Sequence, residues 1–132
     1  MNDMKQNLNM TLEEYRVAIA NGDLKGFGNC PVTILLSMLQ GKWKLLVLYQ
    51  LVLNGTMRFG EIKKMVPGIT NTMLSTILRE LDADGFLTRT QYNEIPPHVE
   101  YALTPKGQDL DRIFYEMFQW TVKHVKCDKS KH

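Results

Sequence analysis

Apolar residues recur at helical spacing along most of the 132-residue chain, and glycine or proline interrupts them at intervals. A short helix is expected over residues 11–20, where Thr11 can cap the first turn. A second helix is expected to begin at Pro31 and to end before Gly41. Residues 43–54 favour a third, because this apolar run is long for the alternative, a buried strand.

Two short helices with a tight turn between them follow. The first covers residues 58–66 and ends at Pro67-Gly68, and Thr70 can cap the second, which stops at Gly85. Four apolar residues of the second helix lie at i, i+3, i+4 and i+7 and form a single inner face: Leu74, Ile77, Leu78 and Leu81. This arrangement predicts a helix–turn–helix.

After the helix–turn–helix the spacing becomes that of strands. Residues 86–92 and 98–103 are rich in strand formers, and two prolines between them predict a hairpin with an open, exposed tip. Thr104 and Pro105 then begin a long helix that reaches about Lys126. The predicted fold class is therefore α+β: a mostly helical winged helix–turn–helix domain with a two-stranded β-hairpin wing.

Small polar side chains and one guanidinium occupy the outer face of the second helix of the motif. Such groups hydrogen-bond base edges and phosphates, and a helix N-terminus favours phosphate. The residues predicted to contact DNA are Thr70, Asn71, Thr72, Ser75, Thr76 and Arg79 here, Lys63 and Lys64 on the preceding helix, and Arg89 and Asn93 on the wing. The wing could reach the backbone or the minor groove. A polar face exposed only to water is the alternative, and the hairpin that follows directly favours DNA.

Charge adds an argument for a dimer. The net charge of +2 is too small to indicate nucleic acid, and residues 58–98 hold five basic and five acidic side chains. DNA binding must then depend on how the charges are arranged, and a dimer would add phosphate contacts. Two helices have apolar faces suited to dimerisation: Leu12, Tyr15 and Ile19 near the N-terminus, and Phe114, Phe118, Thr121 and Val125 in the last helix. The alternative is that both helices pack within one chain.

Several other classes of protein are not indicated. The sequence has no apolar run of about 18 residues and no secretory signal, so a cytoplasmic location without membrane association is expected. The two cysteines, Cys30 and Cys127, lack CxxC spacing, so neither a metal site nor a disulfide framework is predicted. Catalytic motifs do not stand out around the three histidines, so neither an enzyme nor a cofactor is expected.

The chain is expected to divide into three parts. Residues 1–28 form an N-terminal extension with a short helix, and residues 29–126 form the winged helix–turn–helix domain, which includes the C-terminal dimerisation helix. Residues 127–132 form a basic tail.

An ordered set of short motifs runs from about residue 30 to residue 120. It consists of Cys30-Pro31, Gly41-Lys42-Trp43, Arg58-Phe59-x-Glu61, Pro67-Gly68-Ile69-Thr70, Met73-Leu74, Leu78-Arg79-x-Leu81, Asp84-Gly85, Pro96-Pro97-x-Val99-Glu100-Tyr101, Leu103-Thr104-x-x-Gly107 and Trp120. In this set the chain resembles the HxlR-type winged helix–turn–helix transcription regulators, bacterial relatives of the MarR group. The resemblance implies a homodimer, built by the first and last helices, that binds double-stranded operator DNA and controls nearby genes.

The resemblance also implies a signal. Several members of that family are thiol-based sensors whose cysteine matches Cys30, so an oxidant, an electrophile or another small molecule is the expected effector. The segment before Cys30 is longer than is usual in the family, which could shield the thiol, and Cys127 is either its partner across subunits or a bystander. The alternative function is a winged-helix protein-interaction module without specific DNA binding, which the neutral charge of the motif allows.

Overall fold

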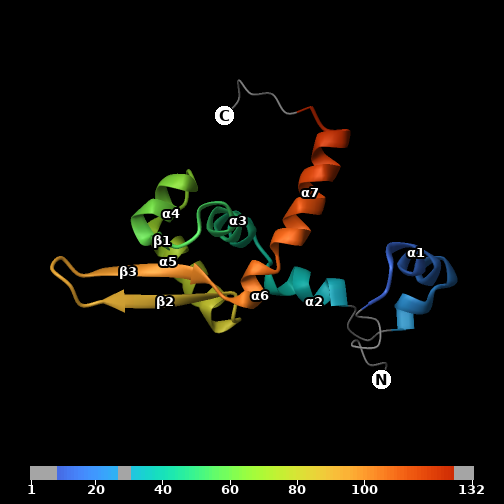
Figure 1. The fold of residues 1–132 in the computed structure, drawn as a ribbon, viewed down its shortest axis with the longest axis horizontal. Coiled ribbons are helices and arrows are strands. Elements are labelled where there is room, and N and C mark those ends of the chain that lie inside the picture. Colours follow the sequence, from blue (N-terminus) through green and yellow to red (C-terminus); the bar gives the residue numbers. More distant parts are fainter. Residues whose placement is uncertain (1–8, 27–30, 127–132) are drawn as a thin grey trace. The chain divides into compact units, whose positions relative to one another are not determined.

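The computed structural model describes residues 9–26 and 31–126, and the chain separates into two compact units, residues 1–40 and 41–132 (Figure 1). The described residues of the first unit form α1 (Leu12–Asn21), the 3₁₀ helix η2 (Asp23–Gly26) and α2 (Pro31–Met38). Both helices predicted for this part of the chain are confirmed, with Thr11 as the N-cap of α1.

The second unit carries the predicted helix–turn–helix. It begins with α3 (Lys44–Asn54), the short strand β1 (Met57–Arg58), α4 (Phe59–Met65) and α5 (Asn71–Ala83). The helical interpretation of residues 43–54 is confirmed by α3. Gly68 forms the turn between α4 and α5 with a φ of 91°, which glycine adopts at little cost. The Thr70 hydroxyl oxygen then accepts a hydrogen bond from the Met73 N–H at 3.1 Å and caps α5, as predicted.

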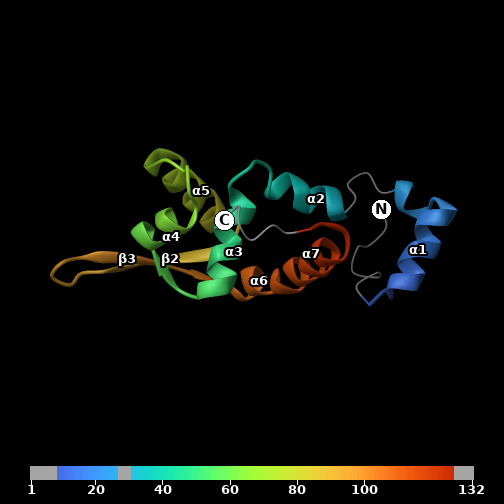
Figure 2. The same cartoon turned by 90° about the horizontal axis from the view of Figure 1, so that it is seen from above.

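The predicted hairpin is confirmed, and the structure adds a strand to it. β2 (Leu87–Tyr92) and β3 (His98–Leu103) pair antiparallel, with Leu87 opposite Leu103 and Tyr92 opposite His98. β1 pairs with the other edge of β3, so the described residues form a three-stranded sheet in the order β1-β3-β2. Two residues are too few for an alternating pattern, which is why periodicity does not reveal β1. The hairpin extends beyond the neighbouring helices in both views (Figures 1 and 2).

The core of the second unit lies where α3, α4 and α5 meet the base of the hairpin. The most deeply buried large side chains are Val47, Leu48, Leu51, Ile62, Leu74, Leu78, Leu81, Phe86 and Leu87. All four residues of the predicted inner face of α5 are buried, which confirms that assignment. Each such side chain contributes roughly 1.5–3 kcal/mol through burial, so this face fixes which side of α5 points outward.

The structure contradicts the prediction of one long helix between Pro105 and Lys126. In its place are two helices, α6 (Pro105–Gln108) and α7 (Asp111–His124), which follow one another in the chain (Figure 1). The Leu110 N–H bonds to the Gly107 carbonyl oxygen, three residues back, at 3.1 Å, and this tightens the chain between them. Close packing at Gly107 requires glycine, because a Cβ atom there would lie 2.1 Å from the Phe86 carbonyl oxygen.

Polar contacts hold α6 in this position. The Thr104 hydroxyl donates to the Gly85 carbonyl oxygen at 2.5 Å, and the Lys106 ammonium donates to the Asp84 carbonyl oxygen at 2.5 Å. The Lys106 ammonium also lies 4.7 Å from the centroid of the Phe86 ring. These contacts tie α6 to the residues that follow α5.

Candidate nucleic-acid interface

The outer face of α5 is polar and open. Asn71, Thr72, Ser75, Thr76 and Arg79 are all exposed, whereas Leu74, Ile77 and Leu78 between them are buried and Met73 is half-buried. The Thr76 hydroxyl donates to the Thr72 carbonyl oxygen at 3.0 Å, so its own oxygen remains an acceptor toward the outside. The face therefore offers short donors and acceptors at its N-terminal end and a guanidinium further along, which is the chemistry that reads base edges.

Cations and amides suited to phosphate flank this helix. Lys63 and Lys64 are exposed in the last turn of α4, directly before the turn that leads into α5. Arg89 is exposed in β2, near the base of the hairpin, and Asn93 is exposed at its far end. The helix–turn–helix and hairpin of one unit thus carry all ten residues predicted to contact DNA. The contacts themselves stay a prediction.

Two acids of this region are engaged within the protein. The Glu80 carboxylate lies 2.8 Å from the Lys44 ammonium, whose side chain is 14% exposed. The Glu61 carboxylate accepts a hydrogen bond from the Arg58 N–H at 2.8 Å and caps α4. Two of the five acidic side chains in residues 58–98 therefore make contacts within the protein. This favours DNA binding even though the net charge of these residues is zero.

A compact cluster of side chains closes the hairpin near its tip. The Tyr92 and His98 rings stack with centroids 4.8 Å apart and 16° between their planes. His98 Nε2 lies 3.1 Å from a Glu100 carboxylate oxygen, and His98 Nδ1 lies 3.8 Å from a Glu94 carboxylate oxygen. Beyond this cluster, Ile95 is fully exposed. Sequence reasoning missed Ile95, although its place before two prolines in the predicted tip was the available signal.

The predicted dimerisation residues of α7 do not all share one environment. Phe114 is buried in its own unit, with its ring centroid 4.9 Å from that of Tyr49. Phe118 and Val125 are exposed, and Thr121 is half-buried. A cleft of about 290 Å³ lies between α3 and α7 and is lined by Leu45, Leu46, Tyr49, Phe114, Met117, Phe118 and Thr121. In the other unit, Leu12, Tyr15 and Ile19 of α1 are exposed.

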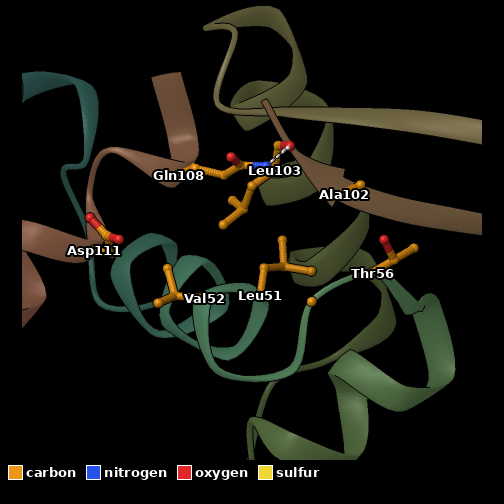
Figure 3. Close-up of a pocket in the computed structure, with 8 residues that line it drawn as sticks. Leu51, Val52, Thr56, Ala102, Leu103, Gln108 and Asp111 are labelled. Atoms are coloured by element: carbon orange, nitrogen blue, oxygen red, sulfur yellow. Dashed lines mark hydrogen bonds between the residues drawn. The ribbon is translucent and has the colours of Figure 1, made fainter. Parts of the chain in front are cut away.

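A second cleft lies beside the break between α6 and α7 (Figure 3). Its volume is about 310 Å³, within the range of small-molecule sites. The lining residues are Leu51, Val52, Gly55, Thr56, Ala102, Leu103, Gln108 and Asp111. The Gln108 amide donates weakly to the Leu103 carbonyl oxygen at 3.5 Å. None of the predicted site residues lines this cleft.

The predicted sensor, Cys30, lies outside the described residues, as does Cys127. Among the residues that the structure describes, no group of three or more histidine, cysteine and acidic side chains is placed to hold a metal ion. Across residues 9–26 and 31–126, no helix is both long enough and apolar enough to cross a membrane.

A buried inner face on α5, a polar outer face and a hairpin directly after it define a winged helix–turn–helix DNA-binding domain. Comparison with known proteins gives the family: the sequence profile of HxlR-like helix-turn-helix proteins matches residues 38–129, and the chain belongs to this family. The chain is thus a winged helix–turn–helix transcriptional regulator, as the sequence motifs implied.

Individual relatives agree with this assignment. The HTH-type transcriptional regulator BH0655 of Halalkalibacterium halodurans is 38% identical over 115 residues, which cover 87% of this chain and 97% of that protein. A MarR-family transcriptional regulator from Porphyromonas gingivalis has a TM-score of 0.69 at 36% identity, over 76% of this chain and 97% of the other. The redox regulator HypR in its oxidized form has a TM-score of 0.66 at 40% identity, over 74% of this chain and 100% of the other.

Proposed function

We propose that this regulator acts as a homodimer that binds a specific operator, with one α5 helix from each protomer in the major groove. The observation that carries the proposal is the division of α5 into a fully buried apolar face and an exposed polar face. In this arrangement the outer face of α5 contacts base edges or orients the helix in the major groove. The residues of this face are Asn71, Thr72, Ser75, Thr76 and Arg79. Thr70 at the N-terminus of α5, with Lys63, Lys64, Arg89 and Asn93, holds the sugar–phosphate backbone.

The apolar surface of α7 supports the homodimer. Phe118 and Trp120 are 57% and 60% exposed, and Ile113, Met117 and Val122 of the same helix are exposed as well. An exposed apolar surface of this extent on a helix favours a protein partner. A second copy of the chain would cover it and would double the number of phosphate contacts. The exposed apolar residues of α1 are a second candidate surface for dimerisation.

The signal we propose is chemical modification of Cys30. HypR, which is 40% identical over 74% of the chain, is a redox regulator, and this supports a thiol switch here. Replacing Cys30→Ser should leave operator binding within about twofold, because serine is nearly isosteric, and should abolish release by diamide or hypochlorite. Anisotropy titrations with and without oxidant measure both the operator affinity and its loss on oxidation. An unchanged oxidant response in Cys30→Ser would remove Cys30 from the sensor role.

The remaining parts of the proposal follow from the regulatory role. We infer a cytoplasmic location, because the operator lies there. We also infer that the protein has no enzymatic activity of its own, since its family is one of transcriptional regulators.

A footprint on the DNA upstream of the chain's own gene tests the proposal. A homodimer with one α5 per half-site should protect two inversely repeated half-sites whose centres lie about 34 Å, one helical turn, or a multiple of it apart. Protection of a single unrepeated site would contradict the homodimer. Uniform protection of all DNA at the same protein concentration would contradict sequence-specific binding and would favour the protein-interaction alternative.

A further inference from the structure

The tip of the hairpin, residues 93–97, differs chemically from the other predicted DNA contacts. Ile95 has a relative exposure of 101%, so its side chain contacts nothing else in the protein. Pro96 and Pro97 beside it are also exposed. The tip extends beyond the helices, and it lies at the end of the second unit away from α7 (Figures 1 and 2). The surface proposed for dimerisation is therefore unsuited to cover Ile95.

This tip carries no cation to neutralise phosphate, and its Asn93 amide is the one side chain in it that we assign to the sugar–phosphate backbone. The sequence has no lysine or arginine between Thr90 and His98, and Arg89 lies nearer the base of the hairpin. Glu94, the acid of the tip, has a carboxylate oxygen 3.8 Å from His98 Nδ1. Proline carries no N–H, so neither residue 96 nor residue 97 can donate a backbone hydrogen bond. Beyond Asn93, the exposed side chains of Ile95, Pro96 and Pro97 can offer DNA an apolar contact only.

The shape of the tip is also held in place. Stacking of Tyr92 on His98 closes the hairpin directly below it, and His98 is further held by Glu100, whose carboxylate oxygen lies 3.1 Å from Nε2. The prolines fix their own φ angles. An apolar side chain presented on a rigid loop loses little conformational entropy when it binds, which increases the net gain from burying it.

We propose that Ile95, flanked by Pro96 and Pro97, is an apolar DNA contact that enters the minor groove beside the major-groove site of α5. This inference rests on the proposed function, because it requires α5 in the major groove. The minor groove is about 6 Å wide, and isoleucine and proline are among the side chains that proteins insert into it as apolar wedges. The wing thereby contributes affinity by excluding water instead of by neutralising phosphate.

The proposal predicts a preference at base pairs that flank the major-groove site. Guanine places an amino group on the floor of the minor groove, where it would meet the isoleucine side chain, whereas A·T pairs do not. Pyrimidine–purine steps, which unstack easily, should be favoured for the same contact. The recognition helix does not read these positions, so the preference should be lost when Ile95 is replaced.

Equilibrium binding of Ile95→Ala over a series of salt concentrations tests the contact. The variant should bind the operator about tenfold more weakly than the wild type, with the same slope of log K against log salt, since no charge is removed. Lys63→Ala, by contrast, should lower the slope by about one. Leu53→Ala is the matched control, because it removes an aliphatic side chain that is 58% exposed on α3, and it should leave affinity unchanged.

Operators with altered flanks make the test specific. For the wild type, replacing a flanking A·T pair by G·C should weaken binding, and replacing it by inosine·C, which lacks the minor-groove amino group, should not. Ile95→Ala should lose this discrimination. Wild-type affinity or unchanged flank discrimination in Ile95→Ala would overturn the inference, while absence of any operator preference in the wild-type protein would instead contradict the proposed function.

Discussion

The helices α5 and α7 are nearly equal in length, 13 and 14 residues, yet they differ in how far their apolar side chains are buried. α5 buries Leu74, Ile77, Leu78 and Leu81 and exposes polar groups on its other face. α7 buries Phe114 and leaves large apolar side chains exposed, among them Phe118 and Trp120. Both helices are amphipathic in sequence, but only α5 is matched to the core of its own unit.

The difference indicates two kinds of partner. A polar outer face needs no cover in water, so the outer face of α5 can remain open until it meets hydrogen-bonding groups in a DNA groove. An exposed apolar face is costly in water and is stabilised by a second apolar surface. One chain therefore carries a helix whose polar outer face suits DNA and a helix whose apolar face, in our proposal, is covered by a second copy of the chain.

The largest expected effect comes from placing bulk on the open face of α5. Ser75→Arg should reduce operator affinity by about 10³, to the level of non-specific binding, because the long side chain prevents close approach of the helix to the groove. The fold should survive, since Ser75 is exposed. Anisotropy measures the affinity and circular dichroism the fold. Ser75→Ala, the control, should lose far less, and retained operator affinity in Ser75→Arg would place the recognition face elsewhere.

The neighbouring residue on the buried face should show the opposite behaviour. Leu74→Ala should lower the free energy of unfolding by about 3 kcal/mol, because it removes fully buried methyl groups and leaves a cavity. At temperatures where the variant is folded, its operator affinity should stay close to that of the wild type. Urea titration measures the stability. Ser75→Ala should change the free energy of unfolding by no more than about 0.5 kcal/mol, because Ser75 is exposed. If Leu74→Ala lowered the free energy of unfolding by as little as Ser75→Ala does, the assignment of the two faces would be wrong.

A charge on the exposed apolar face of α7 should act on assembly. Phe118→Glu should weaken dimerisation about 30-fold, because a carboxylate would have to be buried at the interface. Sedimentation velocity over a range of concentrations measures the equilibrium. Glu116→Gln, a change on the polar side of the same helix, serves as control and should leave it unaltered. A Phe118→Glu protein that dimerises like the wild type would move the interface to another surface, with α1 the first candidate.

How far the sequence predicted this structure depends on the range of the interactions. The helix–turn–helix followed from local signals, namely the Thr70 cap and the spacing of Leu74 and Leu78. The break between α6 and α7 did not. It lies beside Gly107, whose close fit against the Phe86 carbonyl oxygen, 21 positions earlier in the chain, is a long-range contact that local signals do not reveal. β1 was missed because it is defined by its pairing with β3 and not by its own two residues.

The placement of the candidate site residues was also predicted well from local spacing and less well where the packing of the fold decides. Residue type and helical spacing selected the outer face of α5, and the structure places those residues together and exposed. Phe114 was assigned to the dimer interface by its spacing, yet in the structure it packs against Tyr49 of its own unit. Ile95 was passed over because its identity alone is unremarkable in a loop. Its complete exposure on a closed hairpin is a property of the fold.

Specific recognition of DNA through α5 is the central claim, and one measurement tests it most directly. The reduced wild-type protein is titrated by anisotropy against the DNA upstream of its own gene and against random DNA, each at two salt concentrations. We predict a preference of about 10³ or more for the upstream DNA, together with a clear decrease in affinity as salt increases. Equal, weak binding to both DNAs would contradict the claim.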